Sequence, residues 1–307
     1  MRAFPENGLW LKGNLHAHST LSDGELEPEA VLRGYRDRGY DFISLTDHDV
    51  YSDFSALGDP AFLVLPGLEL SCFLSGKKVH VNLVQKGRKS QFAHFQRFSV
   101  KDSGETERIL SKAREDYIVI LNHPDWSLLE YADVKAYECI DAVEVFNYGT
   151  ELCDRLGEST HFWESALRDG KRWKAIASDD SHFGYRDQKG WPFSNLMCDG
   201  FGGWVMVKAE ERTAEAVTKA LAEGSFYASS GPEIHDFRLE HGFAYVSCSP
   251  VSKIIIKGER RNIRRKVGES LTEAVLPLRN NKSYVRVECV DKNGRVAYSN
   301  PLYLEDE

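Results

Sequence analysis

The sequence has few features that would place it in a membrane or in an oxidising compartment. Its 307 residues contain no apolar run long enough to span a bilayer. The start, MRAFPENGLW, has no apolar segment followed by a cleavage site, as a secretory signal would. The six cysteines are scattered and never form a C-x-x-C pair, which argues against a thiolate metal site or a disulfide framework. We therefore expect a soluble, cytoplasmic protein with reduced cysteines and no membrane partner.

Positive charge is also in deficit. The formal net charge is −8, which disfavours a general nucleic-acid-binding surface. With 42% hydrophobic and 28% charged residues, the composition is that of a folded globular protein. A chain of this length can form one large domain and a smaller one, each with its own core.

The order of apolar and polar segments predicts a mixed α/β fold. Apolar runs of strand length, such as DFISLTDHD and YIVILNHPD, alternate with helical patterns such as EPEAVLRGYRDRGY. This alternation predicts parallel βα units. From about residue 234, short alternating strands with turns such as DKNG replace the helices and indicate a small antiparallel β-sandwich. We therefore predict two domains, residues 1–233 and residues 234–307.

A polar segment near the start, GNLHAHSTLSDG, carries two histidines two positions apart. In an extended strand, side chains at alternate positions leave the same face, so His16 and His18 would project together as half of a metal site. A polar strand face followed by an ordinary Asp-Gly turn at Asp23 explains the segment equally well. The remainder of the chain has to decide between these interpretations.

Further ionisable side chains recur where predicted strands end. In a (β/α) barrel the carboxyl ends of the strands converge on one mouth, where active sites are built. Nitrogen and carboxylate donors without cysteine suit Zn, Mn or Fe, whereas Mg alone would want fewer imidazoles. The candidate metal ligands are His16, His18, Asp23, His48, Glu69, His80, His123, Asp180 and His182.

The ordered motifs resemble those of the PHP (polymerase and histidinol phosphatase) family. They are HAHS with SDG, then TDH, GLELS, VHV, NHP and SDDSH, and they span about residues 9–232. The junction YASSGPEI followed by a β unit is similar to a branch of that family with a C-terminal β domain. The resemblance implies a distorted (β/α)7 barrel with a small all-β sandwich, and a metal-dependent hydrolase with three divalent ions per chain.

The resemblance also implies how the ligands are shared. His16, His18, Glu69 and Asp180 would hold the first ion, and Glu69 would bridge to a second ion held with His80 and His123. Asp23, His48 and His182 would hold the third ion. The family's closing motif, Asp-x-His, selects Asp180, and Asp179 would then orient a ligand. The choice between these two neighbours stays open.

The expected chemistry is hydrolysis of a small phosphoester. Two cations that share Glu69 would lower the pKa of a bridging water, and the ions would neutralise charge that grows on the substrate oxygens. We expect Glu69, Asp180 and His182 to act in catalysis on a phosphomonoester or a small phosphodiester, including nucleotide-like ones. Hydrolysis of a carbamate, amide or carboxylic ester is the alternative, and a non-catalytic metal-binding module is a third. Weaker candidates for contacting the substrate are Asn147, Arg155, Arg186 and Lys189.

Overall fold

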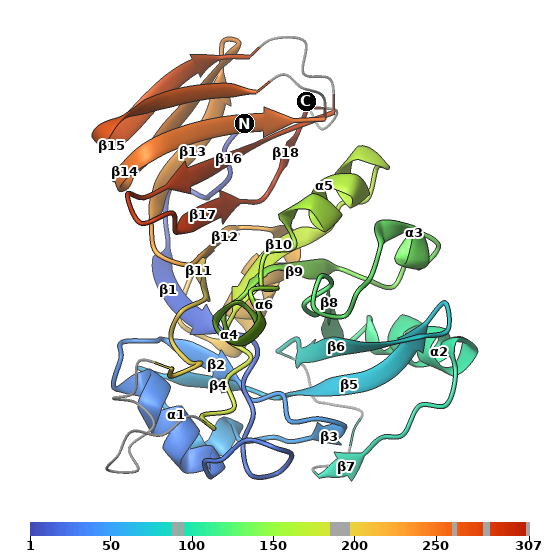
Figure 1. Ribbon diagram of the computed structural model, residues 1–307. Helices are drawn as coiled ribbons and strands as arrows, with labels where there is room; N and C mark the ends of the chain where they lie inside the picture. Colours follow the sequence, from blue (N-terminus) through green and yellow to red (C-terminus); the bar gives the residue numbers. More distant parts are fainter. Residues whose placement is uncertain (88–91, 93–94, 185–196, 260–262, 279–282, 305–307) are drawn as a thin grey trace.

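The strands form two main sheets. The computed structural model describes residues 1–87, 92, 95–184, 197–259, 263–278 and 283–304. Within these residues there is an eleven-stranded sheet, a five-stranded sheet and a two-stranded ribbon. Figure 1 shows β13 to β18 gathered at one end of the molecule and the ribbon of β3 and β7 at the other.

The eleven-stranded sheet runs from the C-terminal strands into the N-terminal half of the chain. Its order is β13-β14-β16-β17-β12-β11-β1-β2-β4, with β15 paired to β14 and β18 paired to β16. Its strands are β1 (Leu9–Asn14), β2 (Phe42–Ser44), β4 (Leu63–Leu65), β11 (Trp204–Ala209), β12 (Phe226–Ser229), β13 (Ile234–Glu240), β14 (Phe243–Gly258), β15 (Arg264–Pro277), β16 (Tyr284–Val290), β17 (Val296–Ser299) and β18 (Leu302–Tyr303).

The five-stranded sheet carries the central part of the site. Its order is β10-β9-β8-β6-β5, and all five residues of YIVIL in β8 are buried, as expected for a strand covered on both faces. Its strands are β5 (Gly67–Leu74), β6 (Lys77–Gln85), β8 (Tyr117–Leu121), β9 (Ala142–Asn147) and β10 (Lys174–Ser178), and the ribbon consists of β3 (Val50–Tyr51) and β7 (Gln96–Arg97).

The helices are short and lie between the strands. In α1 the buried residues Val31, Leu32 and Tyr35 recur at helical spacing, and Pro28 occupies the first turn, where no backbone donor is needed. In α6 the hydroxyl of Thr213 accepts from the backbone N–H of Ala216 at the start, and Gly224 ends the helix at φ 83°. The helices are α1 (Pro28–Arg36), α2 (Ser103–Ala113), α3 (Tyr131–Val134), α4 (Tyr148–Asp154), α5 (Thr160–Arg168) and α6 (Ala214–Glu223), with a 3₁₀ turn η1 (Ser55–Leu57). Of the helices described, none is long and apolar enough to cross a membrane.

The predicted mixed α/β fold is confirmed, whereas the predicted (β/α)7 barrel is not, because the described part of the chain is rich in open sheet. Parallel pairs join β1 to β2, β2 to β4, β8 to β9 and β9 to β10, but β5, β6 and β8 pair antiparallel. The turn between β5 and β6 consists of Ser75 and Gly76, both at positive φ. Two residues are too few for the crossover that a parallel pair requires.

The C-terminal strands share their sheet and their core with the rest of the chain. β12 pairs antiparallel with β17, so backbone hydrogen bonds cross the predicted boundary after residue 233. Phe4 and Tyr227 are buried in the same cluster as Ile234 and Val287. Arg286 of β16 is fully buried and pairs with Glu164 of α5. The division into residues 1–233 and 234–307 stays a prediction.

Candidate metal centre

His16 and His18 lie just beyond the end of β1, where the chain pairs with the segment after β10. Ala17 and Ser181 form a parallel bridge, the N–H of His18 donates to Ser181 O at 2.9 Å, and the N–H of Asp180 donates to His16 O at 3.0 Å. Both histidines are fully buried. The extended pairing therefore holds both imidazoles beside the Asp180 carboxylate. The two side chains project together, as their spacing of two residues predicts.

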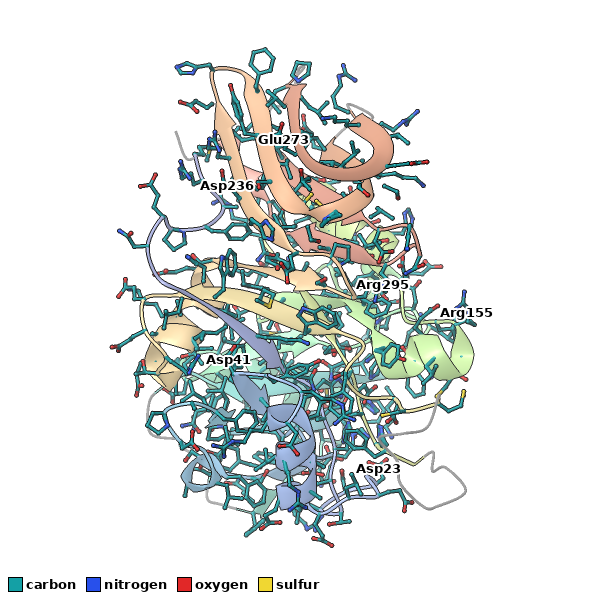
Figure 2. The ribbon with its side chains drawn as sticks, turned by 90° about the vertical axis from the view of Figure 1, so that its left-hand side faces the viewer. Asp23, Asp41, Arg155, Asp236, Glu273 and Arg295 are labelled. Carbon is teal, nitrogen blue, oxygen red and sulfur yellow. The ribbon has the colours of Figure 1, made fainter. Side chains whose placement is uncertain are left out.

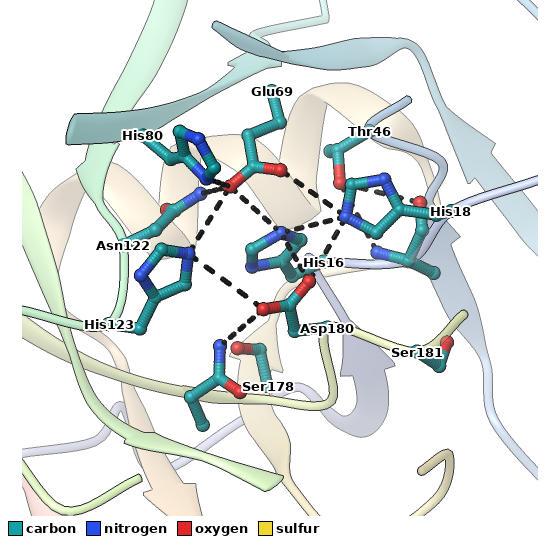
Figure 3. Close-up of polar contacts among 12 residues, drawn as sticks. His16, His18, Thr46, Glu69, His80, Asn122, His123, Ser178, Asp180 and Ser181 are labelled. Carbon is teal, nitrogen blue, oxygen red and sulfur yellow. Dashed lines mark hydrogen bonds and ion pairs between the residues drawn. The ribbon is translucent and has the colours of Figure 1, made fainter. Parts of the chain in front are cut away.

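Glu69 of β5 lies at the centre of the site, fully buried among five imidazoles, and Figure 3 shows those of His16, His18, His80 and His123 around it. Backbone bonds from its N–H to Thr46 O and from Asp49 N–H to its own carbonyl fix the strand against the loop after β2. Its Oε1 lies 3.2 Å from His16 Nε2, 3.2 Å from His80 Nδ1 and 3.5 Å from His123 Nε2, and its Oε2 lies 2.9 Å from His48 Nδ1 and 3.3 Å from His18 Nε2.

Asp180 closes the other side of this cluster. Its Oδ1 lies 3.1 Å from the Nε2 atoms of both His16 and His18, and its Oδ2 lies 3.8 Å from His123 Nε2 (Figure 3). The residue has a φ of 55°, and His123 has a φ of 27°. Positive φ is uncommon for residues other than glycine, and such residues cluster at functional sites.

Some of the buried ligand atoms have no hydrogen-bond partner. The Nε2 atoms of His16 and His18 lie only 3.2 Å apart, and two unprotonated nitrogens at this distance repel each other. Glu69 Oε2 and His48 Nδ1 have no hydrogen bond of acceptable geometry, although they are buried and 2.9 Å apart. Nitrogen and carboxylate lone pairs that converge in this way fit divalent cations.

The charges of the site are coupled. Burial raises the pKa of Glu69, but His16 and hydrogen bonds from neighbouring imidazoles outweigh burial and hold that pKa well below its usual value. Burial lowers the pKa of His16, but Asp180, Glu69 and Glu144 raise it by more. The carboxylates therefore stay ionised and attract positive charge, and bound metal ions would take the place of the imidazole protons.

In the part of the chain that the structure describes, three groups of ligand atoms are compact enough for a metal site, with all ligand atoms of a group within 4.8 Å of one another. The group around Asp180 is the set that the resemblance implies for the first ion. His123 belongs to none of the groups, although it lies beside Glu69. The groups are His16, His18, Glu69 and Asp180; His48, Glu69 and His80; and His18, Asp23, His48 and His182.

Asp23 and His182 lie at the outer edge of the cluster. Asp23 Oδ1 is 3.4 Å from His182 Nε2, and Asp23 Oδ2 is 3.7 Å from His48 Nε2. Burial lowers the pKa of His182, but the Asp23 and Asp180 carboxylates raise it by more, to about 9. Figure 2 shows Asp23 at the end of the molecule opposite Glu273 of the C-terminal strands. The structure thus brings all nine predicted residues into one region.

Glu144 of β9 is a buried carboxylate that the sequence analysis missed. Its Oε1 lies 2.7 Å from His16 Nδ1, and its Oε2 accepts from the N–H of His123 at 2.8 Å. The amide of Asn147 donates to Glu144 Oε2 at 2.9 Å and to Asp180 Oδ2 at 3.2 Å. Carboxylates behind metal-binding imidazoles fix the tautomer and ring orientation. A glutamate within the apolar run DAVEVF was the signal available in the sequence.

Asn122 holds the central carboxylate from another side. Its Nδ2 donates to Glu69 Oε1 at 2.7 Å and to Asn82 Oδ1 at 2.9 Å. It directly precedes His123, so the LNHP motif supplies both a candidate ligand and a donor that orients Glu69.

Asp179 faces away from the cluster. Its Oδ2 accepts from Tyr35 Oη at 2.7 Å and from the N–H of Phe201 at 2.8 Å, and its Oδ1 accepts from the N–H groups of Gly202 and Gly203. Asp179 therefore anchors the segment that leads into β11, while Asp180 lies among the imidazoles.

Asp47 and Gly24 shape the loop that carries His18 and Asp23. Asp47 accepts from the N–H and the hydroxyl of Ser19 at 2.7 and 2.8 Å. A Cβ on Gly24 would lie 2.7 Å from the carbonyl carbon of His18, so only glycine fits where the loop crosses the histidine backbone.

A pocket of about 260 Å³ opens next to the cluster. Among its described lining residues there are four aspartates and no lysine or arginine. Arg155 has an 84% exposed side chain that pairs with Glu151, and Figure 2 shows it at the surface, while Arg186 and Lys189 fall outside the described residues. The lining residues are Asp23, His48, His80, His123, Trp126, Gly149, Thr150, Cys153, Asp154, Asp180, His182 and Asp199.

Comparison with solved structures identifies the fold. A two-domain protein from Bacteroides vulgatus, containing a predicted PHP-like metal-dependent phosphoesterase, matches over 97% of both chains with a TM-score of 0.54 and 17% identity. The resemblance to the PHP family is confirmed at the level of the fold. An amidohydrolase from Chromobacterium violaceum matches 61% of this chain and 93% of its own, with a TM-score of 0.38 and 16% identity.

Sequence comparison reaches only part of the chain. No family model matches it. Phosphoribosyl 1,2-cyclic phosphate 1,2-diphosphodiesterase from Eggerthella lenta is 38% identical over 74 residues. The match covers 22% of this chain and 28% of that relative, so the chain corresponds to less than a third of the relative's length.

Proposed function

We propose that the protein is a metal-dependent phosphoesterase that hydrolyses a phosphomonoester or a small phosphodiester. The observation that carries this proposal is the convergence of buried imidazole and carboxylate ligand atoms around Glu69, of which Glu69 Oε2 and His48 Nδ1 have no hydrogen-bond partner. The fold shared with a PHP-like protein supports it, as does the partial match to a phosphodiesterase.

The side chains of the cluster would hold three divalent ions, of Zn, Mn or Fe. His16, His18, Glu69 and Asp180 would hold the first, and Asp23, His48 and His182 the third. For the second ion, Glu69 would act with His80, together with His48 or His123. Bound ions of this kind lower the pKa of a water so that hydroxide forms near neutral pH, and they neutralise charge on phosphoryl oxygens.

The residues around the ligands would keep the site in one arrangement. Glu144 holds His16 by its Nδ1, so that the Nε2 lone pair faces the cluster. Asn122 donates to one oxygen of Glu69 and would fix the plane of this carboxylate between the ions that it is proposed to share. The four aspartates of the pocket lining would repel a phosphate, so its binding would depend on the ions.

Metal analysis combined with a substrate panel tests this function. Protein loaded in turn with Zn, Mn and Fe would be assayed with an aryl phosphomonoester, an aryl phosphodiester and an aryl carbamate. We expect turnover of a phosphoester, loss of turnover after treatment with a chelator, and recovery when metal returns. Turnover of the carbamate alone would show an amide or ester hydrolase. Bound metal without turnover of any substrate would favour the non-catalytic module.

A further inference from the structure

Trp126 is a large apolar side chain at the opening of the candidate metal centre. It follows His123 by three residues, and the residue is 41% exposed although it lines the 260 Å³ pocket. The loop that carries it is tight, because the N–H of Ser127 donates to His123 O and that of Leu129 donates to Pro124 O, both at 3.0 Å. These backbone hydrogen bonds hold the loop from which the indole side chain projects.

The indole N–H of Trp126 already donates a hydrogen bond within the protein. Its Nε1 donates to Asp154 Oδ2 of α4 at 2.9 Å. Its ring meets that of His123 edge to face, with centroids 4.9 Å apart, and lies 6.3 Å from the ring of His80. A ligand in the pocket can therefore meet Trp126 through the ring surface, where contacts are apolar or aromatic.

The remaining lining is polar or small. Among the described residues of the pocket, Trp126 is the single large apolar side chain. The volume of about 260 Å³ lies below the range of roughly 300–1,000 Å³ that holds a drug-sized ligand. It can take a phosphate and one compact group beside it. For a phosphate bound at the proposed ions, the exposed ring beside His123 and His80 would give that group an apolar surface on which to pack.

We propose that Trp126 binds the organic group of the substrate and selects phosphoesters that carry a flat ring next to the phosphorus over those of small alkyl alcohols. This inference rests on the proposed phosphoesterase function and names its substrate class. In proteins that bind single-stranded nucleic acids, any base can stack on an aromatic side chain, because every base has a π-face. Aryl and heteroaryl groups also have a π-face, so they can stack on Trp126 in the same way.

The competing explanation is that Trp126 only supports the rings of His123 and His80. In that case its removal would disturb the metal ligands and weaken the binding of every phosphorus ligand alike. A selectivity role predicts instead that its removal affects ligands with a ring and spares those without one.

Two non-hydrolysable ligands separate these explanations. Phenylphosphonate carries a ring directly on phosphorus, methylphosphonate does not, and hydrolysis does not cleave the carbon–phosphorus bond of either. Their Kd values would be measured by calorimetry on the metal-loaded full chain, for wild type, Trp126→Ala and Trp126→Phe. Leu128→Ala is the matched control, because Leu128 is 76% exposed, two residues away and outside the pocket lining. Metal content would be measured on every protein.

We expect wild type and Leu128→Ala to bind phenylphosphonate about tenfold more tightly than methylphosphonate. Trp126→Ala should lose this preference with unchanged metal content and unchanged affinity for methylphosphonate, and Trp126→Phe should keep most of it. If Trp126→Ala does not fold, Trp126→Leu keeps an apolar side chain without a ring and gives the same comparison.

Equal affinity of wild type for the two ligands would overturn the inference while leaving the phosphoesterase proposal intact. Equal weakening of both ligands in Trp126→Ala, together with loss of metal, would show the supporting role instead. Failure of wild type to bind either phosphonate or to hydrolyse any phosphoester would remove the proposed function, and this inference with it.

Discussion

The Glu144 carboxylate lies 2.7 Å from His16 Nδ1, and the Glu69 carboxylate lies 3.2 Å from Nε2 of the same imidazole. One buried glutamate thus faces each nitrogen of a fully buried ring. Glu144 also holds the backbone of His123. Because a hydrogen bond at Nδ1 decides which tautomer the ring adopts, Glu144 keeps Nε2 available toward the cluster.

Glu144→Gln should weaken metal binding without unfolding the protein. The amide keeps the shape of the side chain but removes the charge that favours a proton on His16 Nδ1. We expect metal affinity or activity to fall about 10- to 100-fold, the usual cost of losing such a partner. Metal titration of the variant and of wild type measures this. The control is Glu115→Gln, an exposed glutamate, which should behave as wild type. Unchanged affinity in Glu144→Gln would mean that Glu144 has no role in orienting His16.

Glu69→Gln should be the most damaging change in the cluster. Its carboxylate contacts five imidazoles, and the amide would leave two proposed cations without the charge that offsets their repulsion. We expect a fall in bound metal and a loss of activity of about 10²-fold or more. Metal content and turnover of the phosphoester panel would be measured on the same preparation. A variant that keeps the full rate on any substrate would exclude a role for Glu69 in sharing the metal-activated water.

Most residues of the cluster could be predicted because they are ionisable side chains where an apolar segment ends, although His80 lies within a strand and Asp23 in a turn. That signal placed His48, Glu69 and Asp180 together although they are far apart in the sequence, and the structure brings them into contact. Glu144 and Asn122 were missed because they contact the candidate ligands His16 and Glu69 and are not candidate ligands themselves. Such contacts depend on which strands are neighbours in the sheet. The strand order itself was only partly predictable. The two-residue turn at Ser75 shows that β5 and β6 are antiparallel, but the alternation of strands and helices favoured a barrel.

Paired substitutions at Asp179 and Asp180 should have opposite effects. Asp180→Asn should lose metal with little change in stability, because its oxygens face His16 and His18. Asp179→Asn should keep most of the metal but lower the free energy of unfolding by about 1–3 kcal/mol, because its carboxylate serves four donors in the fold. Metal analysis and urea denaturation separate the two variants. A reversal of these effects would make Asp179 the ligand.

Arg286→Met should destabilise the junction between the C-terminal strands and α5. Arg286 is fully buried between Glu164 and Glu288 and lies over the ring of Trp163. Removal of the cation leaves buried carboxylates that have lost a partner, which costs about 3–5 kcal/mol in comparable pairs. Urea denaturation at pH 7 measures the loss. The control is Arg295→Met, because Arg295 is 55% exposed and its pair with Asp291 should contribute about 0–1 kcal/mol.

The ion pair between Arg286 and Glu288 predicts that the free energy of unfolding depends on pH. Burial raises the pKa of Glu288, but Arg286 and Lys257 lower it by more, so its folded-state pKa lies below its unfolded-state value. Its contribution to stability is therefore complete above an unfolded-state pKa of about 4.3 and is lost as the pH falls through the lower folded-state pKa. The difference between wild type and Arg286→Met should shrink as the pH falls below about 4. A constant difference from pH 7 to pH 3 would show that charge on Glu288 does not contribute.

A chain that ends at residue 233 should keep the metal centre but become less soluble. All nine predicted ligands precede that point, so the cluster does not need the C-terminal strands for its donor atoms. The truncation would nevertheless remove β17, the partner of β12, and would uncover Phe4 and Tyr227, which are 4% and 2% exposed in the full chain. We expect metal binding together with aggregation that depends on concentration.

Phe4→Ser and Tyr227→Thr, introduced into the shortened chain, should restore solubility, because they remove the uncovered apolar rings. A soluble, folded, shortened chain that binds no metal would mean that the C-terminal strands are needed to hold the ligands in place, and the boundary at residue 233 would not separate two independent domains.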